Sequence, residues 1–203
     1  FQLIKPIKKE EAMNSTISVI AIIGSLRKNS WNRLLYQNMM QRIPSSLACE
    51  EASIDSIPLY DGDVEEVAYP ESVKQLKEKI RQANGILFVT PEYNYSIPGV
   101  LKNVLDWTSR PPTDIPYIDK PGGIVGASTS YFGTVRSQLH LRQVLHALGM
   151  HVMNTPEVML PKAESLFINS SIQDERSIKK IDSFWKHFEQ WVLQHLESVE
   201  KKL

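Results

Sequence analysis

Hydroxyl, amide and guanidinium side chains gather in the segment GSLRKNSWN, residues 24–32, directly after an apolar run. Arg27 carries a planar, permanently charged donor fork that suits phosphate oxygens, while Ser25, Ser30 and Asn32 offer further donors. A helix that begins here would add free backbone N–H groups and the positive end of its dipole. The segment could therefore hold a terminal phosphate. An ordinary capped helix, with Ser30 as N-cap and Arg27 in solvent, explains the same residues equally well.

This segment also argues against two large classes of nucleotide-binding protein. It does not contain the GxGxxG pattern of dinucleotide-binding βαβ units, nor the GxxxxGK[ST] pattern of P-loop NTPases. Both patterns are therefore disfavoured as explanations of a phosphate site at this position.

A second polar segment, TPEYNYSIPG at residues 90–99, follows another apolar run and crowds two tyrosines and an asparagine into one turn. Its backbone N–H groups could bond the heteroatoms of a flat ring, with Tyr93 or Tyr95 packed near that ring. A simple turn with surface aromatic residues is the alternative. The length and aromatic content of the turn favour a ligand.

The third segment, ASTSYFG at residues 127–133, contains small polar residues such as Ser128. These could contact the pyrimidine edge of a flavin, and composition alone supports a structural turn about equally well. Because ligands of open parallel sheets bind beyond the carboxyl ends of the strands, all three segments are expected at one edge.

Apolar, β-branched runs alternate with helical patterns along the chain, which predicts βα units. Strands are expected at Ile17–Ile23, Cys49–Ile54, Ile86–Thr90, Gly123–Ala127 and His151–Met159. Helices are expected at Trp31–Ile43, Glu71–Ala83, Pro98–Thr108, Val135–Leu148 and Gln173–Val199. Such units form an α/β fold with an open parallel sheet and helices on both faces.

The chain has no repeat or domain linker, so residues 13–203 are expected to form a single domain. Residues 1–12 are expected to be an N-terminal extension or the remnant of a tag. The proline-rich stretch Pro111–Pro121 reads as a long loop, expected near the site because it follows the third unit.

Charge and composition narrow the possible partners. With 23 basic and 23 acidic residues the formal net charge is zero, which argues against a nucleic-acid partner. No apolar run is long enough to span a membrane. Cys49 is the single cysteine, which excludes an internal disulfide and fits a cytoplasmic protein. The histidines show no metal-ligand spacing, so no metal site is expected.

Together the segments GSLRKNSWN, TPEYNYSIPGVLKNVLDWTSR and the Ser/Gly-rich turn resemble the NADPH-dependent FMN reductase family, which includes chromate, quinone and azo reductases. The resemblance implies a flavodoxin-like three-layer sandwich, with a five-stranded parallel sheet of order 2-1-3-4-5 and FMN at the point where strand order reverses. It also implies a homodimer or homotetramer.

By position, the resemblance assigns the FMN contacts. The phosphate is expected at Ser25, Arg27, Ser30 and Asn32. The isoalloxazine ring is expected at Pro91, Glu92, Tyr93 and Asn94, with Ser128 at its other edge. No side chain is expected to act as a catalytic residue, because the cofactor carries the chemistry.

The function implied by the resemblance is an FMN-dependent NAD(P)H oxidoreductase. Hydride passes from NADPH or NADH through flavin N5 to a small acceptor (a quinone, free flavin, azo compound or chromate) in a ping-pong reaction. The alternative is a non-enzymatic flavodoxin-type carrier or FMN-binding module. Such carriers are usually strongly acidic with a Ser/Thr-rich phosphate loop, so neutral charge and Arg27 favour the enzyme.

Overall fold

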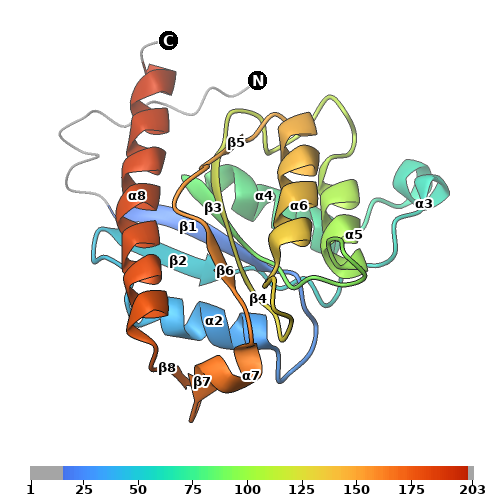
Figure 1. Ribbon diagram of the computed structural model, residues 1–203. Helices are drawn as coiled ribbons and strands as arrows, with labels where there is room; N and C mark the ends of the chain where they lie inside the picture. Colours follow the sequence, from blue (N-terminus) through green and yellow to red (C-terminus); the bar gives the residue numbers. More distant parts are fainter. Residues whose placement is uncertain (1–15, 201–203) are drawn as a thin grey trace.

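The computed structural model describes residues 16–200, and its centre is one parallel sheet (Figure 1). The strand order is β2-β1-β3-β4-β5, with β6 also paired to β4, and every pairing is parallel. This confirms the predicted flavodoxin-like order. The strands are β1 (Ile17–Ile23), β2 (Leu47–Glu51), β3 (Gly85–Val89), β4 (Pro121–Ala127), β5 (His151–Val152) and β6 (Val158–Leu160).

The fifth strand differs from the single run expected over His151–Met159. It is split into β5, which pairs with the start of β4, and β6, which pairs with the end of β4. The cis peptide Thr155–Pro156 lies between the two pieces. Because proline has no N–H to donate to a ladder, the strand cannot run through this point.

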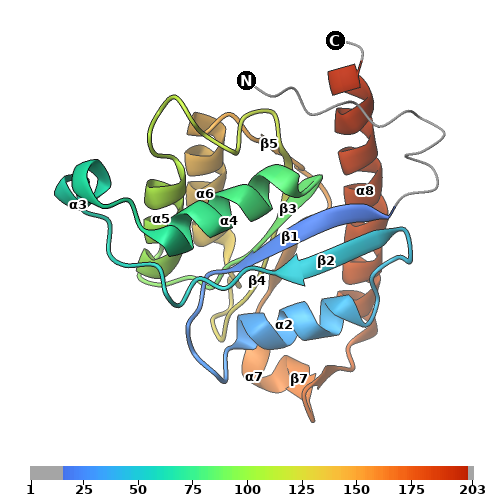
Figure 2. The same ribbon diagram turned by 180° about the vertical axis from the view of Figure 1, so that it is seen from behind.

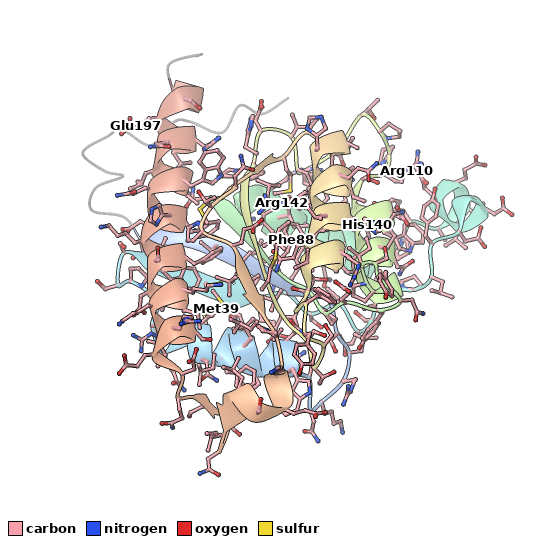
Figure 3. The ribbon with its side chains drawn as sticks, viewed as in Figure 1. Met39, Phe88, Arg110, His140, Arg142 and Glu197 are labelled. Carbon is pink, nitrogen blue, oxygen red and sulfur yellow. The ribbon has the colours of Figure 1, made fainter. Side chains whose placement is uncertain are left out.

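Helices cover both faces of the sheet (Figures 1 and 2). One core contains alternate residues of β1 (Val19, Ala21 and Ile23) together with Met39, and the other contains Ile20, Ile22 and Phe88. Met39 and Phe88 are labelled in Figure 3. The first core lies under α2 (Trp31–Met40) and α8 (Glu175–Glu200), and the second under α4 (Glu71–Gln82), α5 (Gly99–Thr108) and α6 (Val135–Ala147).

Four short elements were not expected from the sequence because they are too brief to show periodicity. Helix α3 (Gly62–Val67) projects from the body of the protein (Figure 1). Helix α7 (Ala163–Leu166) leads into a hairpin of β7 (Phe167–Ile168) and β8 (Ser171–Ile172).

The proline-rich loop lies at the amino edge of the sheet, so the expectation that it lies near the site is wrong. Asp114 in this loop is 2.8 Å from the ammonium of Lys77, and Lys120 donates to the carbonyl of Arg81 at 2.7 Å. Both partners belong to the second half of α4, which ends just before β3 begins. The reason is topological: α5 starts at the carboxyl edge and returns the chain to the amino edge before β4.

None of the helices described over residues 16–200 is both long and apolar enough to cross a membrane. The predicted extension at residues 1–12 lies outside the described residues.

Candidate functional site

A cavity of about 820 Å³ opens at the carboxyl edge of the sheet, and all three polar segments line it. Its volume falls within the range of about 300–1,000 Å³ that is usual for small-molecule sites. Every predicted site residue lines this cavity except Asn94. The lining also includes residues that the sequence did not single out: Lys28, Asn29, Trp31, Arg33, Leu34, Gln37, Ala127, Thr129, Glu164 and Ser170.

The first segment wraps the N-terminus of α2, where Ser30 is the N-cap. Its hydroxyl oxygen accepts the backbone N–H groups of Asn32 at 3.2 Å and Arg33 at 3.4 Å. The hydroxyl of Ser25 similarly accepts the N–H of Arg27 at 3.4 Å. Ser30 therefore both caps helix α2 and lines the cavity.

The charges at this end of the cavity are positive. Among residues 16–200, neither Arg27 nor Lys28 forms an ion pair, and both are exposed. Arg33, by contrast, is paired with Glu51. Two cations without carboxylate partners thus lie beside a helix N-terminus, which also favours anions.

The second segment forms a tight reverse turn. Tyr93 and Ser96 exchange both backbone hydrogen bonds at 3.0 Å, and Asn94 and Tyr95 between them have φ of 48° and 65°. Two successive residues with positive φ are the geometry of a two-residue hairpin turn. The turn places Tyr93 against the cavity and Asn94 outside its lining.

Glu92 connects this turn to the start of α6. One carboxylate oxygen accepts the backbone N–H groups of Arg136 at 2.9 Å and Ser137 at 3.2 Å, and the other lies 3.4 Å from the Arg136 guanidinium. Thr134, at the N-cap position of α6, makes no capping bond with its side chain. Glu92 therefore caps α6 from 44 residues away, and its carboxylate is held by backbone and guanidinium donors.

Two buried hydroxyl groups hold the backbone of Pro91, the residue before Glu92. The carbonyl of Pro91 accepts from the hydroxyl of Ser137 at 2.8 Å and from that of Thr90 at 2.9 Å. Thr90 and Ser137 are both fully buried, so this end of β3 is joined rigidly to α6.

Arg136 is a site-edge residue that the sequence did not reveal, since nothing in its local pattern distinguishes it from a solvent-exposed helix residue. Its guanidinium carbon lies 4.0 Å from the ring centroid of Tyr95 and 4.9 Å from that of Phe132. The second and third segments are thereby linked through one side chain.

The third segment is fastened to the residues around β6. The N–H of Ser128 donates to the carbonyl of Leu160 at 2.9 Å, and the N–H of Ala163 donates to the carbonyl of Ser128 at 3.0 Å. Ser128 and Thr129 then line the cavity.

Gly126 allows the close approach that this arrangement needs. A Cβ at Gly126 would lie 2.3 Å from the carbonyl oxygen of Thr90 and 2.4 Å from the hydroxyl of Thr134. Gly24 makes a milder contact, with Pro98 Cγ at 3.1 Å from its Cβ position. The cavity depends on a residue without a side chain at the end of β4.

Cys49 lies in β2 and outside the lining of this cavity. Burial raises the pKa of its thiol to about 12, so the group stays protonated near neutral pH. Cys49 is therefore a small, partly buried hydrophobic residue and not a nucleophile.

The geometry can be compared with known proteins. The sequence profile of the NADPH-dependent FMN reductase family matches residues 17–165. The chain belongs to this family. Family members are oxidoreductases that use FMN and NAD(P)H, and the sheet order and the strand-end cavity agree with that membership.

Individual relatives support the same assignment. An NAD(P)H-dependent FMN reductase of Pseudomonas aeruginosa is 42% identical over 181 residues, covering 89% of this chain and 97% of the relative. A quinone reductase of Escherichia coli is 46% identical over 149 residues, covering 72% and 79%. The solved structure of FerB, a flavoenzyme NAD(P)H:(acceptor) oxidoreductase from Paracoccus denitrificans, has a TM-score of 0.81 and 32% identity, covering 88% of this chain and 98% of FerB.

Proposed function

We propose that the cavity binds FMN with its phosphate at the α2 end and its ring against the second and third segments. The phosphate ligands are Ser25, Arg27 and Ser30, with Asn32 in the same segment. The ring contacts come from the residues predicted for it: Pro91, Glu92, Tyr93, Asn94 and Ser128. The observation that carries this proposal is one continuous cavity that joins all three segments and has two unpaired cations at one end.

The residues present fit such a ligand. Hydroxyl groups, an unpaired guanidinium and a helix N-terminus suit a phosphate dianion, while Tyr93 and Trp31 supply aromatic surface in the cavity wall. When bound, FMN would supply the hydride-transfer chemistry between NAD(P)H and an acceptor. The chain binds and orients the ligands, and the Glu92 carboxylate is occupied in holding α6.

We propose that NAD(P)H and the acceptor use the site in turn, in a ping-pong reaction. The acceptor is a small molecule of the quinone, free flavin, azo or chromate class. The names of the relatives support the first two classes. Steady-state rates over a grid of NADPH and quinone concentrations test the order: parallel double-reciprocal lines are expected, and intersecting lines would exclude it.

Substitution of Arg27 tests the cofactor site directly. We expect Arg27→Ala to weaken FMN binding at least tenfold and to leave riboflavin binding unchanged, because riboflavin lacks the phosphate. Lys102→Ala is the matched control, since Lys102 is an exposed cation on α5 paired with Asp106. Equal losses for FMN and riboflavin would contradict the phosphate assignment.

The carrier alternative makes a different prediction for the same protein. An enzyme oxidises NADPH rapidly when a quinone or free flavin is added, and a flavodoxin-type carrier does not. A preparation that binds FMN but turns over with none of the proposed acceptors would rule out the reductase.

We also propose that residues 13–203 form one FMN-binding domain that assembles as a homodimer or homotetramer in the cytoplasm. Support for assembly comes from aromatic side chains left exposed near the cavity: Tyr95 is 65% exposed, Phe132 62% and Tyr131 78%. Light scattering coupled to gel filtration should give a mass of two or four chains, and a single-chain mass would refute the assembly.

A further inference from the structure

Two buried asparagines on α2 make the same kind of contact to two different segments. Asn38 donates to the carbonyl of Ser170 at 2.9 Å, and its oxygen accepts the N–H of Ile172 at 2.9 Å. Asn32 donates to the carbonyl of Ala127 at 2.8 Å, and its oxygen accepts the N–H of the same residue at 2.9 Å. Each side chain thus forms a two-way bond with backbone, as one strand does with another.

The position of Asn32 matters more than that of Asn38 because of what it joins. Asn32 belongs to the first turn of α2, two residues after the N-cap Ser30. Ala127 is the last residue of β4, and Ser128 of the third segment follows it. The contact spans 95 residues of sequence and connects two segments that line the cavity.

The side chain of Asn32 makes two hydrogen bonds to Ala127. The residue is 2% exposed, one amide N–H donates to the Ala127 carbonyl, and the amide oxygen accepts the Ala127 N–H. The second amide N–H is not used in this contact. Loss of either bond would leave a buried backbone group of Ala127 unsatisfied, at a cost of about 1–3 kcal/mol. The side chain therefore holds the first turn of α2 to the end of β4.

We propose that Asn32 is a positioning residue that couples the phosphate end of the FMN site to the third segment. This inference rests on the proposed function. Filling the phosphate end fixes Ser30 and the first turn of α2. Through Asn32 the same restraint reaches Ala127, and the N–H of Ser128, bonded to Leu160, follows it. The contact with the ring edge then depends on Asn32.

Comparison of FMN with riboflavin separates the two roles of Asn32. A phosphate ligand would affect only FMN, as expected for Arg27. A positioning residue affects both flavins, so we expect Asn32→Ala to weaken FMN and riboflavin by similar factors, about tenfold each. The visible spectrum of the bound flavin should also shift, because the ring edge changes its surroundings.

Asn32→Ala removes both bonds to Ala127 and adds no charge beside the phosphate end. Asn38→Ala is the matched control on the same helix. It should lower stability to a similar degree and leave the ratio of FMN to riboflavin affinity and the flavin spectrum as in the wild type.

A measurement on the wild-type apoprotein avoids any question of whether the variants fold. Addition of inorganic phosphate, which reaches the α2 end without a ring, should shift the backbone amide NMR signals of Ala127 and Ser128. In Asn32→Ala these shifts should disappear while those of Ser30 remain. Asn38→Ala should show the wild-type pattern.

Two results would overturn the proposal. One is a loss of FMN affinity in Asn32→Ala with riboflavin affinity unchanged, which would make Asn32 a phosphate ligand. The other is a Ser30 response to phosphate in the wild type with no response at Ala127 or Ser128. Failure of the proposed function looks different, because the wild-type protein would then bind neither FMN nor riboflavin.

Discussion

Charged side chains at the two edges of the sheet differ in whether they have partners within the protein. At the amino edge, Lys77 pairs with Asp114, and Lys120 donates to the carbonyl of Arg81. At the carboxyl edge, Arg27 and Lys28 form no ion pair with any residue between 16 and 200. Charged groups at the amino edge therefore stabilise the fold, whereas Arg27 and Lys28 at the carboxyl edge are available to a ligand.

Backbone geometry shows the same contrast. The carboxyl edge brings three segments together through a glycine without room for a side chain, a carboxylate that caps a distant helix and an asparagine that joins two segments. The difference teaches that a binding site in this fold is built by non-local backbone contacts, while Arg27 and Lys28 keep their charges free of ion pairs with residues 16–200. Each side of this comparison can be tested.

The largest effect is expected at Gly126. Gly126→Ala would place a Cβ 2.3 Å from the Thr90 carbonyl oxygen, so backbone must move. We expect the free energy of unfolding in urea to fall by about 3 kcal/mol, together with loss of FMN binding. Gly122→Ala in the same strand is the control, since its Cβ would meet the flexible end of Met150 at 2.6 Å. Equal losses for both variants would contradict the contrast between the edges.

A smaller effect is expected from Glu92→Ala, which removes the cap of α6 and the partner of Arg136. Urea denaturation should show a loss of about 2 kcal/mol, because two backbone N–H groups and a guanidinium lose a charged acceptor. Flavin affinity should fall as well. Glu92→Gln keeps an acceptor oxygen and should recover most of the stability.

Asn84→Ala provides the amino-edge counterpart to Glu92. The Asn84 oxygen accepts both the N–H and the hydroxyl of Ser18 at 2.9 Å. We expect a loss of about 1 kcal/mol in urea denaturation, with flavin affinity unchanged. A change in flavin affinity comparable to that of Glu92→Ala would show that the two edges are coupled.

The smallest effect is a pH dependence at the amino edge. Burial lowers the pKa of Lys120 to about 8, so between that pH and its usual 10.5 the unfolded chain binds more protons than the folded one. The contribution of Lys120 to stability therefore increases as pH rises from about 8 to 10.5 and levels off below 8, where both states are protonated. The difference in unfolding free energy between wild type and Lys120→Met should change by about 1 kcal/mol from pH 7 to pH 9. A pH-independent difference would contradict this.

Much of the fold could be predicted from the sequence because the apolar periodicity of each element is local. The expected strand Ile17–Ile23 is confirmed residue for residue, and the other main helices and strands differ only at their ends. The break in the last strand was signalled by Pro156. Short elements such as α3 and α7 could not be predicted, since a few residues contain no measurable period.

The candidate site was predictable in its location and not in its connections. All the assigned residues except Asn94 line one cavity, because parallel strands bring their carboxyl ends to the same edge. Asn94 lies outside the cavity lining, because residue type predicts a turn but not the direction of its tip, and its contact with the ring stays a prediction. The roles of Arg136 and Gly126 depend on contacts with segments distant in sequence, for which one sequence contains no signal.

The sequence by itself determined the alternation of strands and helices, the three polar segments and the family, because these depend on residue type and spacing. The tertiary structure decided which polar groups remain available to a ligand. Asn32 and Arg27 are near neighbours in the chain and look alike as phosphate donors. In the folded protein the Asn32 amide is hydrogen-bonded to Ala127, whereas Arg27 has no carboxylate partner among residues 16–200. Each polar side chain can make only a few hydrogen bonds, and contacts between segments distant in sequence determine which of these are made within the protein.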